Sequence, residues 1–101
     1  MTAPDAERAA ALVRTLVEER LAACGNIIHG ITSIYRWSGA IHEETEVLII
    51  LKTTAAAAES LAARVPELHP YDVPEVVVLP VLTGHPPYLD WVRDETSRRD
   101  S

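Results

Sequence analysis

The sequence contains only one cysteine, no excess of basic residues and no long apolar run, and each shortage excludes a class of protein. Cys24 has no second cysteine with which to form an internal disulfide, so we expect a reducing, cytoplasmic environment. The 9 Lys and Arg residues are outnumbered by 15 Asp and Glu, which gives a formal net charge of −6. A surface that binds nucleic acid needs the opposite charge. No apolar run approaches the roughly 20 residues of a membrane-spanning helix. We therefore expect no nucleic-acid partner and no membrane span.

Sequence motifs of well-known enzyme classes are missing as well. The chain has no Gly-rich phosphate loop, no nucleophile elbow, and neither a Cys-x-x-Cys nor a His-Glu-x-x-His metal motif. Its nearest approach to acid–base chemistry is Glu75, which lies close to His69 in the sequence. Since these two residues alone support no named reaction, we expect that the protein is not an enzyme.

The 101 residues are enough for a single domain, residues 1–101, with one hydrophobic core. Hydrophobic periodicity and turn residues predict the order α-β-β-α-β-α. The expected elements are a helix over 4–23, strands over 27–36 and 41–53, a helix over 55–65 ended by Pro66, a strand over 76–82, and a helix over 86–92 followed by a frayed tail from Arg93.

The two adjacent strands predict a long β-hairpin that turns at Trp37–Ala40. Strict alternation places Tyr35 and Trp37 on the same face as Ile27. The second strand is polar on both faces in its outer half and apolar on both faces over Val47–Leu51, which is typical of a central strand. A hairpin of this length must project beyond a small domain, so its exposed edges need partners.

The predicted order lacks one element of a ferredoxin-like fold, which opens with a strand. Only Met1 is available ahead of Thr2 to form it. Without this central strand, backbone groups of its neighbours remain unpaired, at about 1–3 kcal/mol for each buried group. We expect an α+β fold: a ferredoxin-like α/β sandwich with an antiparallel sheet, a truncated first strand, a long β-hairpin and an extra C-terminal helix. We also expect the native chain to start upstream of Met1.

The segment His69–Glu75 is stiffened by two prolines and carries an imidazole, a phenol and carboxylates. A stiff loop presents its side chains at nearly fixed positions and therefore loses little entropy when a ligand binds. The alternative is a rigid connector in which Tyr71 simply packs against the core. The sequence leaves both interpretations open.

Five separated motifs, in order, resemble the divalent-cation tolerance (CutA) family. The similarity extends over essentially the whole chain, and five motifs at family spacing are more specific than any one of them. The junction Thr2–Asp5 also resembles the family's passage from first strand to first helix. The motifs are Leu21–Asn26, Ser33–Gly39, Leu51–Thr54, His69–Tyr71 with Pro74 and Glu75, and Tyr88–Trp91.

This resemblance implies a ferredoxin-like subunit that assembles as a homotrimer through its extended hairpins. It also implies clefts between subunits, as in the PII signalling proteins. The implied role is tolerance to divalent metals, with copper or another divalent cation as the bound ion. The alternative is a PII-like trimer that binds a small anion or metabolite in the intersubunit cleft and signals to a partner.

The resemblance implies copper ligands that this chain only partly retains. In family members these ligands are a cysteine at the end of the first strand and two adjacent histidines. Their positions fall here on Met1, Leu68 and His69, so His69 is the remaining metal candidate. One imidazole is not a metal site, because zinc or copper needs three or four ligands. A further group shares one strand face and forms either a cation site or a solvated hairpin tip: His42, Glu44 and Glu46.

We expect a set of mainly aromatic and charged residues to line or flank the intersubunit cleft together with His69. Aromatic walls with a few polar groups are usual in small-molecule pockets, although the same aromatic residues also serve as anchors of subunit interfaces. Lys52 is expected either to pair with Glu75 or to hold an anion. The cleft candidates are Tyr35, Trp37, Lys52, Tyr71, Glu75 and Trp91.

Overall fold

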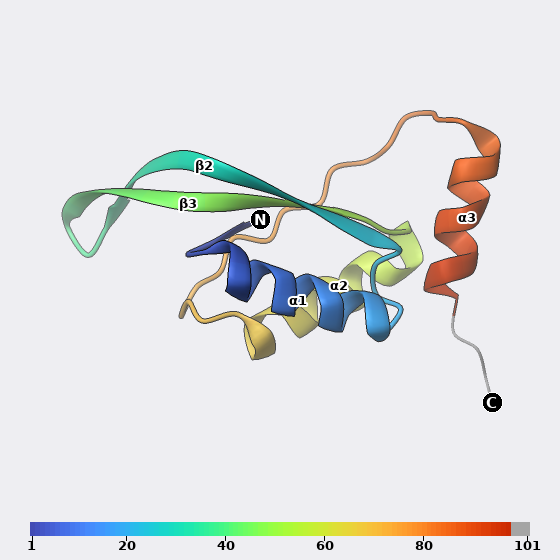
Figure 1. The fold of residues 1–101 in the computed structure, drawn as a ribbon, viewed down its shortest axis with the longest axis horizontal. Coiled ribbons are helices and arrows are strands. Elements are labelled where there is room, and N and C mark those ends of the chain that lie inside the picture. The colour runs from blue at the N-terminus through green and yellow to red at the C-terminus, as the bar shows by residue number, and fades with distance from the viewer. Residues whose placement is uncertain (98–101) are drawn as a thin grey trace.

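A small antiparallel sheet carries two helices on one face in the computed structural model, which describes residues 1–97 (Figure 1). The strands lie in the order β1-β3-β2, with β3 in the centre. The helix α3 stands at the end of the sheet opposite the hairpin turn, with its last turn beside the start of α2 (Figure 1). This arrangement confirms the predicted α+β class. The elements are β1 (Thr2–Ala3), α1 (Ala6–Glu18), β2 (Cys24–Trp37), β3 (Ala40–Lys52), α2 (Ala55–Leu68) and α3 (Pro86–Thr96).

The hydrophobic core lies between the sheet and the helices α1 and α2. Val47 and Ile49 of β3 are buried on the face that the helices cover. Leu16 of α1 and Val65 of α2 are fully buried against them. At the surface, the guanidinium of Arg64 donates two 2.8 Å hydrogen bonds to the carboxylate of Glu19, which joins the helices and holds the pKa of Glu19 below its usual range. Apolar burial therefore fixes the helices on one face of the sheet.

The first helix is shorter than the predicted 4–23. Asp5 caps its N-terminus by accepting a 2.8 Å hydrogen bond from the backbone N–H of Arg8. The helix ends at Glu18 because the chain reverses at Arg20, whose φ is +61°. This left-handed conformation cannot continue a right-handed helix. The apolar residues that follow enter β2 instead of completing another turn.

The predicted hairpin is present, with strands somewhat longer than 27–36 and slightly offset from 41–53. Ser38 and Gly39 form its turn with positive φ angles of +50° and +78°, as a tight two-residue β-turn requires. The outer part of the hairpin extends well beyond the two helices (Figure 1). We call this outer part, residues 31–46, the arm. Since neither helix reaches it, most of its side chains are open to solvent in the single chain, and Glu46 at its base is the buried exception.

A β-bulge in β2 overturns the predicted alternation of side chains. Ile28 pairs with Leu48 and Ile31 pairs with Glu46, so two residues of β2 oppose one residue of β3. Gly30, the second of these two residues of β2, has a φ of +73°. The extra residue exchanges the two faces, so that Ile27 faces the helices whereas Tyr35 and Trp37 lie on the opposite face. The prediction that they share one face is wrong because a glycine-containing bulge shifts the period-2 pattern.

Two predicted helix ends are also wrong. Pro66 lies inside α2, which continues to Leu68, because a proline this close to a helix C-terminus removes only one hydrogen bond. The backbone N–H of His69 closes the helix on the carbonyl of Val65 at 2.8 Å. The helix α3 runs past 92 to Thr96, so its last turn is ordered where the sequence predicts fraying. The remainder of that predicted tail, residues 98–101, lies outside the described residues.

The first strand is only two residues long, as the truncated-strand prediction requires. Thr2 and Ala3 pair with Leu48 and Val47, and Met1 exchanges two backbone hydrogen bonds with Ile49. The predicted strand over 76–82 is not formed: this segment belongs to no ladder. A strand at this position needs a hydrogen-bonded neighbour, and β1 is too short to supply one.

Gly25 on β2 is predicted to tolerate no side chain. A Cβ atom there would lie 2.6 Å from Cγ1 of Val13 and 2.8 Å from Cδ2 of Leu51. We expect Gly25→Ala to lower the free energy of unfolding by about 1–3 kcal/mol through overpacking. Guanidinium unfolding at fixed protein concentration measures this. The adjacent exposed change Asn26→Ala is the control and should stay within about 0.5 kcal/mol of the parent; equal effects of the two changes would contradict the prediction.

Candidate functional site

A buried polar group lies where the arm meets the body of the domain. Glu46 is only 5% exposed although it occupies a strand of the projecting hairpin. The hydroxyl of Tyr71, from the loop after α2, donates a 2.6 Å hydrogen bond to a carboxylate oxygen of Glu46. The ring of Tyr71 packs against the ring of His69, with centroids 4.7 Å apart. We call Glu46, His69 and Tyr71 the Glu46 cluster.

Both ring nitrogens of His69 are occupied by backbone groups. The backbone N–H of Tyr71 donates to Nδ1 at 3.1 Å, so Nδ1 must be the unprotonated nitrogen of a neutral imidazole. The other nitrogen, Nε2, then carries the proton and donates to the carbonyl of Thr2 at 2.8 Å. His69 is 7% exposed. In the single chain this imidazole therefore joins β1 to the loop after α2.

Electrostatics in the Glu46 cluster keep the tyrosine hydroxyls protonated. Burial raises the pKa of Tyr71 far above its ordinary value, and the hydrogen bond to the Glu46 carboxylate adds to the rise. The pKa of Tyr35 is raised as well, first by loss of solvent contact and then by the carboxylates of Glu44 and Glu46. Two phenols therefore face one acidic strand, and that of Tyr71 donates a hydrogen bond to it. This arrangement favours positioning of the loop over proton transfer near neutral pH.

The predicted cleft residues are spread along the sheet, with Tyr71 at the base of the arm, Glu75 beside Met1 and the other four toward the two ends. Tyr35 stacks on His42 in the arm, with ring centroids 5.4 Å apart, and Trp37 lies at the end of the same strand. Lys52 ends β3 at the other end of the sheet, where it pairs with Cys24. The Cys24 sulfur lies 3.7 Å from the hydroxyl of Tyr88 on α3, the helix that also carries Trp91. One chain alone therefore does not bring the candidates into one cleft.

Glu75 is not paired with Lys52, which was one of the two expectations for that lysine. Its carboxylate lies 4.0 Å from the N-terminal ammonium of Met1. Within residues 1–97, Lys52 makes no ion pair. Lys52 is a partly buried residue at the end of β3.

A single copy of the chain does not fit a copper site. Among residues 1–97, no three His, Cys, Asp or Glu side chains gather around a common point. His42, Glu44 and Glu46 share one strand face as predicted, but Glu46 is turned into the Glu46 cluster and is not part of a solvated tip. His42 instead has Nε2 3.3 Å from the carbonyl oxygen of Trp37. Within residues 1–97, one copy therefore does not bring together the three or four ligands that a copper site needs.

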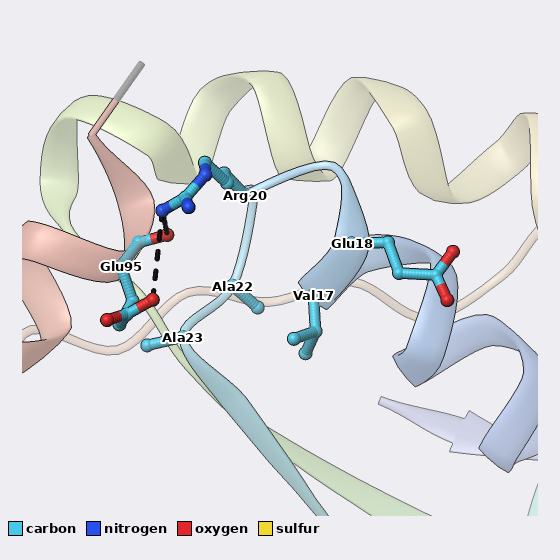
Figure 2. A pocket seen from close by; sticks show the side chains of 6 residues that line it. All are labelled: Val17, Glu18, Arg20, Ala22, Ala23 and Glu95. Carbon is cyan, nitrogen blue, oxygen red and sulfur yellow. Dashed lines mark hydrogen bonds and ion pairs between the residues drawn. The ribbon is translucent and has the colours of Figure 1, made fainter. Parts of the chain in front are cut away.

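Two small pockets formed by residues 1–97 lie away from these residues. One, of about 230 Å³, is bounded by the end of α1, the loop between α1 and β2, and α3. Arg20 points across it and bonds the backbone carbonyl of Glu95 at 3.2 Å, whereas Glu18 points away (Figure 2). The other, of about 270 Å³, lies between α1 and the end of α2 and is lined mainly by apolar atoms of residues such as Leu12 and Leu68. Neither contains a predicted cleft residue.

Glu46 is the residue of the cluster that sequence reasoning underestimated. Its neighbours Glu43, Glu44 and Thr45 are exposed, so the sequence there looks like a solvated strand. The signal that could have identified it is the stiff loop His69–Glu75, which carries a tyrosine that needs a buried partner for its hydroxyl. The bulge at Gly30 then decides which face of the hairpin that tyrosine meets.

Helices capable of crossing a membrane do not occur in residues 1–97: none combines the required length with sufficient apolar character.

Known proteins match the chain along nearly its whole length. The family described as CutA1 divalent ion tolerance protein matches residues 1–95. The divalent-cation tolerance protein CutA of Thermus thermophilus is 52% identical over 95% of this chain and 93% of its own length. Protein CutA of Mus musculus is 48% identical over 95% of this chain, but the match spans only 54% of the mouse protein.

Solved structures show the same fold. The cation tolerance protein from Thermus thermophilus superposes with a TM-score of 0.90 at 52% identity, covering 95% of this chain and 93% of that chain. CutA1 from Pyrococcus horikoshii superposes with a TM-score of 0.90 at 42% identity, covering 96% and 94%. Both sequence and structure therefore agree, and the chain belongs to the CutA1 divalent ion tolerance protein family.

Proposed function

We propose that this protein is a homotrimeric divalent-cation tolerance protein that acts by binding a metal, with copper as the first candidate, rather than by catalysing a reaction. The observation that carries the proposal is the arm, which exposes large apolar side chains on both faces in the single chain. The names of the related proteins, which refer to divalent-ion tolerance, support the metal part. The chain's single cysteine supports a cytoplasmic location, although the relative from Arabidopsis thaliana is named chloroplastic.

The arm exposes large apolar side chains on both faces. Ile34 and Ile41 are 65% and 67% exposed on the face that continues from the helix-covered side of the sheet. Tyr35 and Trp37 are 39% and 50% exposed on the other face. A projecting two-stranded ribbon with this composition is unstable in water on its own. Contact with neighbouring copies on both faces removes this surface from water, and a closed ring of three copies leaves no arm uncovered.

The metal part of the proposal requires ligands from neighbouring copies. Of the ligand positions implied by the family resemblance, only that of His69 still carries a histidine in this chain. In the single chain its ring nitrogens are hydrogen-bonded to backbone groups of Thr2 and Tyr71. To bind copper, His69 must release one of these hydrogen bonds. The ion must also find two or three further ligands at a junction between copies.

A second candidate function is favoured by Lys52. This residue is partly buried and its ammonium has no carboxylate partner within residues 1–97, and a cation in that position is suited to hold an anion. In this candidate the protein is a PII-like trimer that binds a small anion or metabolite between copies. The same titrations separate the two candidates.

Light scattering tests the assembly. We expect a mass of about 33 kDa, three times the 11.1 kDa of one chain. Ile34→Lys should shift the protein toward smaller species, because it places a charge on the apolar arm. Ala10→Lys, on the exposed side of α1, is the matched control and should leave the mass unchanged. A monomeric parent protein would exclude the proposed trimer.

Calorimetric titration with copper tests the metal. We expect binding by the parent protein and an affinity lower by about tenfold or more in His69→Gln. His29→Gln, at the exposed bulge, should bind as the parent does. Circular dichroism and light scattering must show that both variants keep the fold and the assembly. No copper binding, together with a phosphate-bearing anion that binds and is lost in Lys52→Met, would contradict the metal proposal and support the second candidate.

The Glu46 cluster is predicted to stabilise the base of the arm. Tyr71→Phe leaves the buried Glu46 carboxylate without its hydroxyl donor, so we expect the free energy of unfolding to fall by about 1–3 kcal/mol. Denaturant unfolding at fixed protein concentration measures the change. The double change Tyr71→Phe with Glu46→Met removes both polar partners and should recover most of the loss. An unaltered stability of Tyr71→Phe would show that the hydrogen bond contributes nothing.

A further inference from the structure

The turn that ends α1 is a Schellman motif with an arginine at its left-handed position. The backbone N–H of Leu21 donates to the carbonyl of Leu16 at 2.9 Å, and that of Arg20 donates to the carbonyl of Val17 at 3.1 Å. The residue with positive φ in this motif is usually glycine, because a Cβ atom strains the left-handed conformation. Arg20 adopts this conformation with a φ of +61°. The strain lowers the folding equilibrium constant by about tenfold, and it is offset if the side chain makes a contact that glycine cannot make.

The side chain of Arg20 caps the C-terminus of α3. Its Nη1 donates to the backbone carbonyl of Glu95 at 3.2 Å and lies 3.7 Å from Oε2 of the same residue (Figure 2). The last four carbonyls of a helix have no partner within the helix. A cation beside them also interacts favourably with the negative end of the helix dipole. Arg20 therefore ends α1 with its backbone and caps α3 with its side chain.

The other attachments of α3 are weak. Among residues 86–96, Val92 is the one buried side chain, whereas Tyr88 and Trp91 are 41% and 42% exposed. The hydroxyl of Thr96 lies 3.5 Å from that of Thr54, at the long limit of a hydrogen bond. The first turn of α3 has no side-chain cap. Since an isolated helix of 11 residues is marginal in water, α3 depends on its contacts with the rest of the domain.

We propose that Arg20 is a latch: its guanidinium holds α3 at the end of the sheet, and α3 opens as a unit when this contact is lost, while the rest of the domain stays folded. The opening unit includes Gly84. A Cβ atom on this glycine would lie 3.2 Å from Cδ2 of Leu89, so the chain before α3 packs directly on the helix. Elements held by few buried contacts open more readily than the core.

The latch sets the position of the aromatic pair on α3. The rings of Tyr88 and Trp91 have centroids 5.7 Å apart. The hydroxyl of Tyr88 lies 3.7 Å from the sulfur of Cys24, which pairs across the sheet with Lys52. Arg20 is therefore a positioning residue for Trp91, one of the predicted cleft residues, although it lies outside the predicted cleft itself. The inference does not depend on which ion the protein binds.

Amide hydrogen exchange on the full chain tests the opening of α3. In the parent protein we expect the amides of residues 92–96 to exchange at least tenfold faster than those of Leu48 and Ile50, which lie in the ladder of β2 with β3. Arg20→Met removes the guanidinium but keeps a side chain at the strained position, whereas Arg20→Gly removes both the guanidinium and the strain. In each variant the amides of residues 92–96 should exchange about tenfold faster than in the parent.

Urea unfolding at fixed protein concentration separates the latch from the strain. Arg20→Met should lower the folding equilibrium constant by about tenfold, because the contact is lost and the strain remains. Arg20→Gly should keep this constant within about threefold of the parent, because relief of strain offsets the lost contact. Arg14→Met, on the exposed side of α1, is the matched control and should change neither the exchange nor the unfolding by more than about twofold.

Three results would overturn the proposal. The first is exchange of residues 92–96 as slow as that of Leu48 and Ile50 in the parent, because α3 would then open only when the whole domain unfolds. The second is unchanged exchange of residues 92–96 in both Arg20 variants, because the guanidinium would then not hold the helix. The third is an equal loss of stability in Arg20→Gly and Arg20→Met, because no backbone strain would then be stored at this position.

Discussion

The antiparallel pairing of β2 with β3 is the constraint on which the rest of the structure depends. The two strands stay paired from Cys24 and Lys52 at one end to Trp37 and Ala40 at the turn, and the single bulge redistributes their side chains without breaking the ladder. The inner half of this ribbon supports the helices, whereas the outer half extends past them. The same continuous ladder therefore produces both the buried core of the domain and its uncovered arm. Stability of the subunit and the exposure of its arm thus have one source.

The Glu46 cluster connects the base of the arm to the loop after α2 and to β1. Through Tyr71 the loop after α2 reaches the arm strand, and through His69 it reaches β1. Neither contact is provided by the hydrophobic core, which ends farther along β3. A buried carboxylate and a neutral imidazole are costly in isolation, and here each is satisfied by directional hydrogen bonds. Because hydrogen bonds are directional, the cluster restricts the position of the loop after α2 more than non-directional apolar packing could.

The sequence was sufficient for the fold class and for most element centres, since these depend on local periodicity. The ends of α1 and α2 were less predictable, because they depend on the left-handed conformation of Arg20 and on how late in a helix Pro66 falls. The bulge at Gly30 could not be located from alternation alone, although it decides the faces of Tyr35 and Trp37. The strand expected over 76–82 has the right composition, yet strand formation depends on a neighbour that local sequence does not reveal.

The candidate site was less predictable than the fold because its residues are far apart in one chain. Lys52 and Trp91 lie at one end of the sheet and Tyr35 at the other, so their expected meeting depends entirely on assembly. His69 illustrates the same point for metal binding. Both of its ring nitrogens form hydrogen bonds within the subunit. To bind a metal, His69 must give up one of these hydrogen bonds, and the free energy of metal binding with ligands from a neighbouring copy must exceed that loss. Burial inside the subunit and function between subunits therefore compete for the same imidazole.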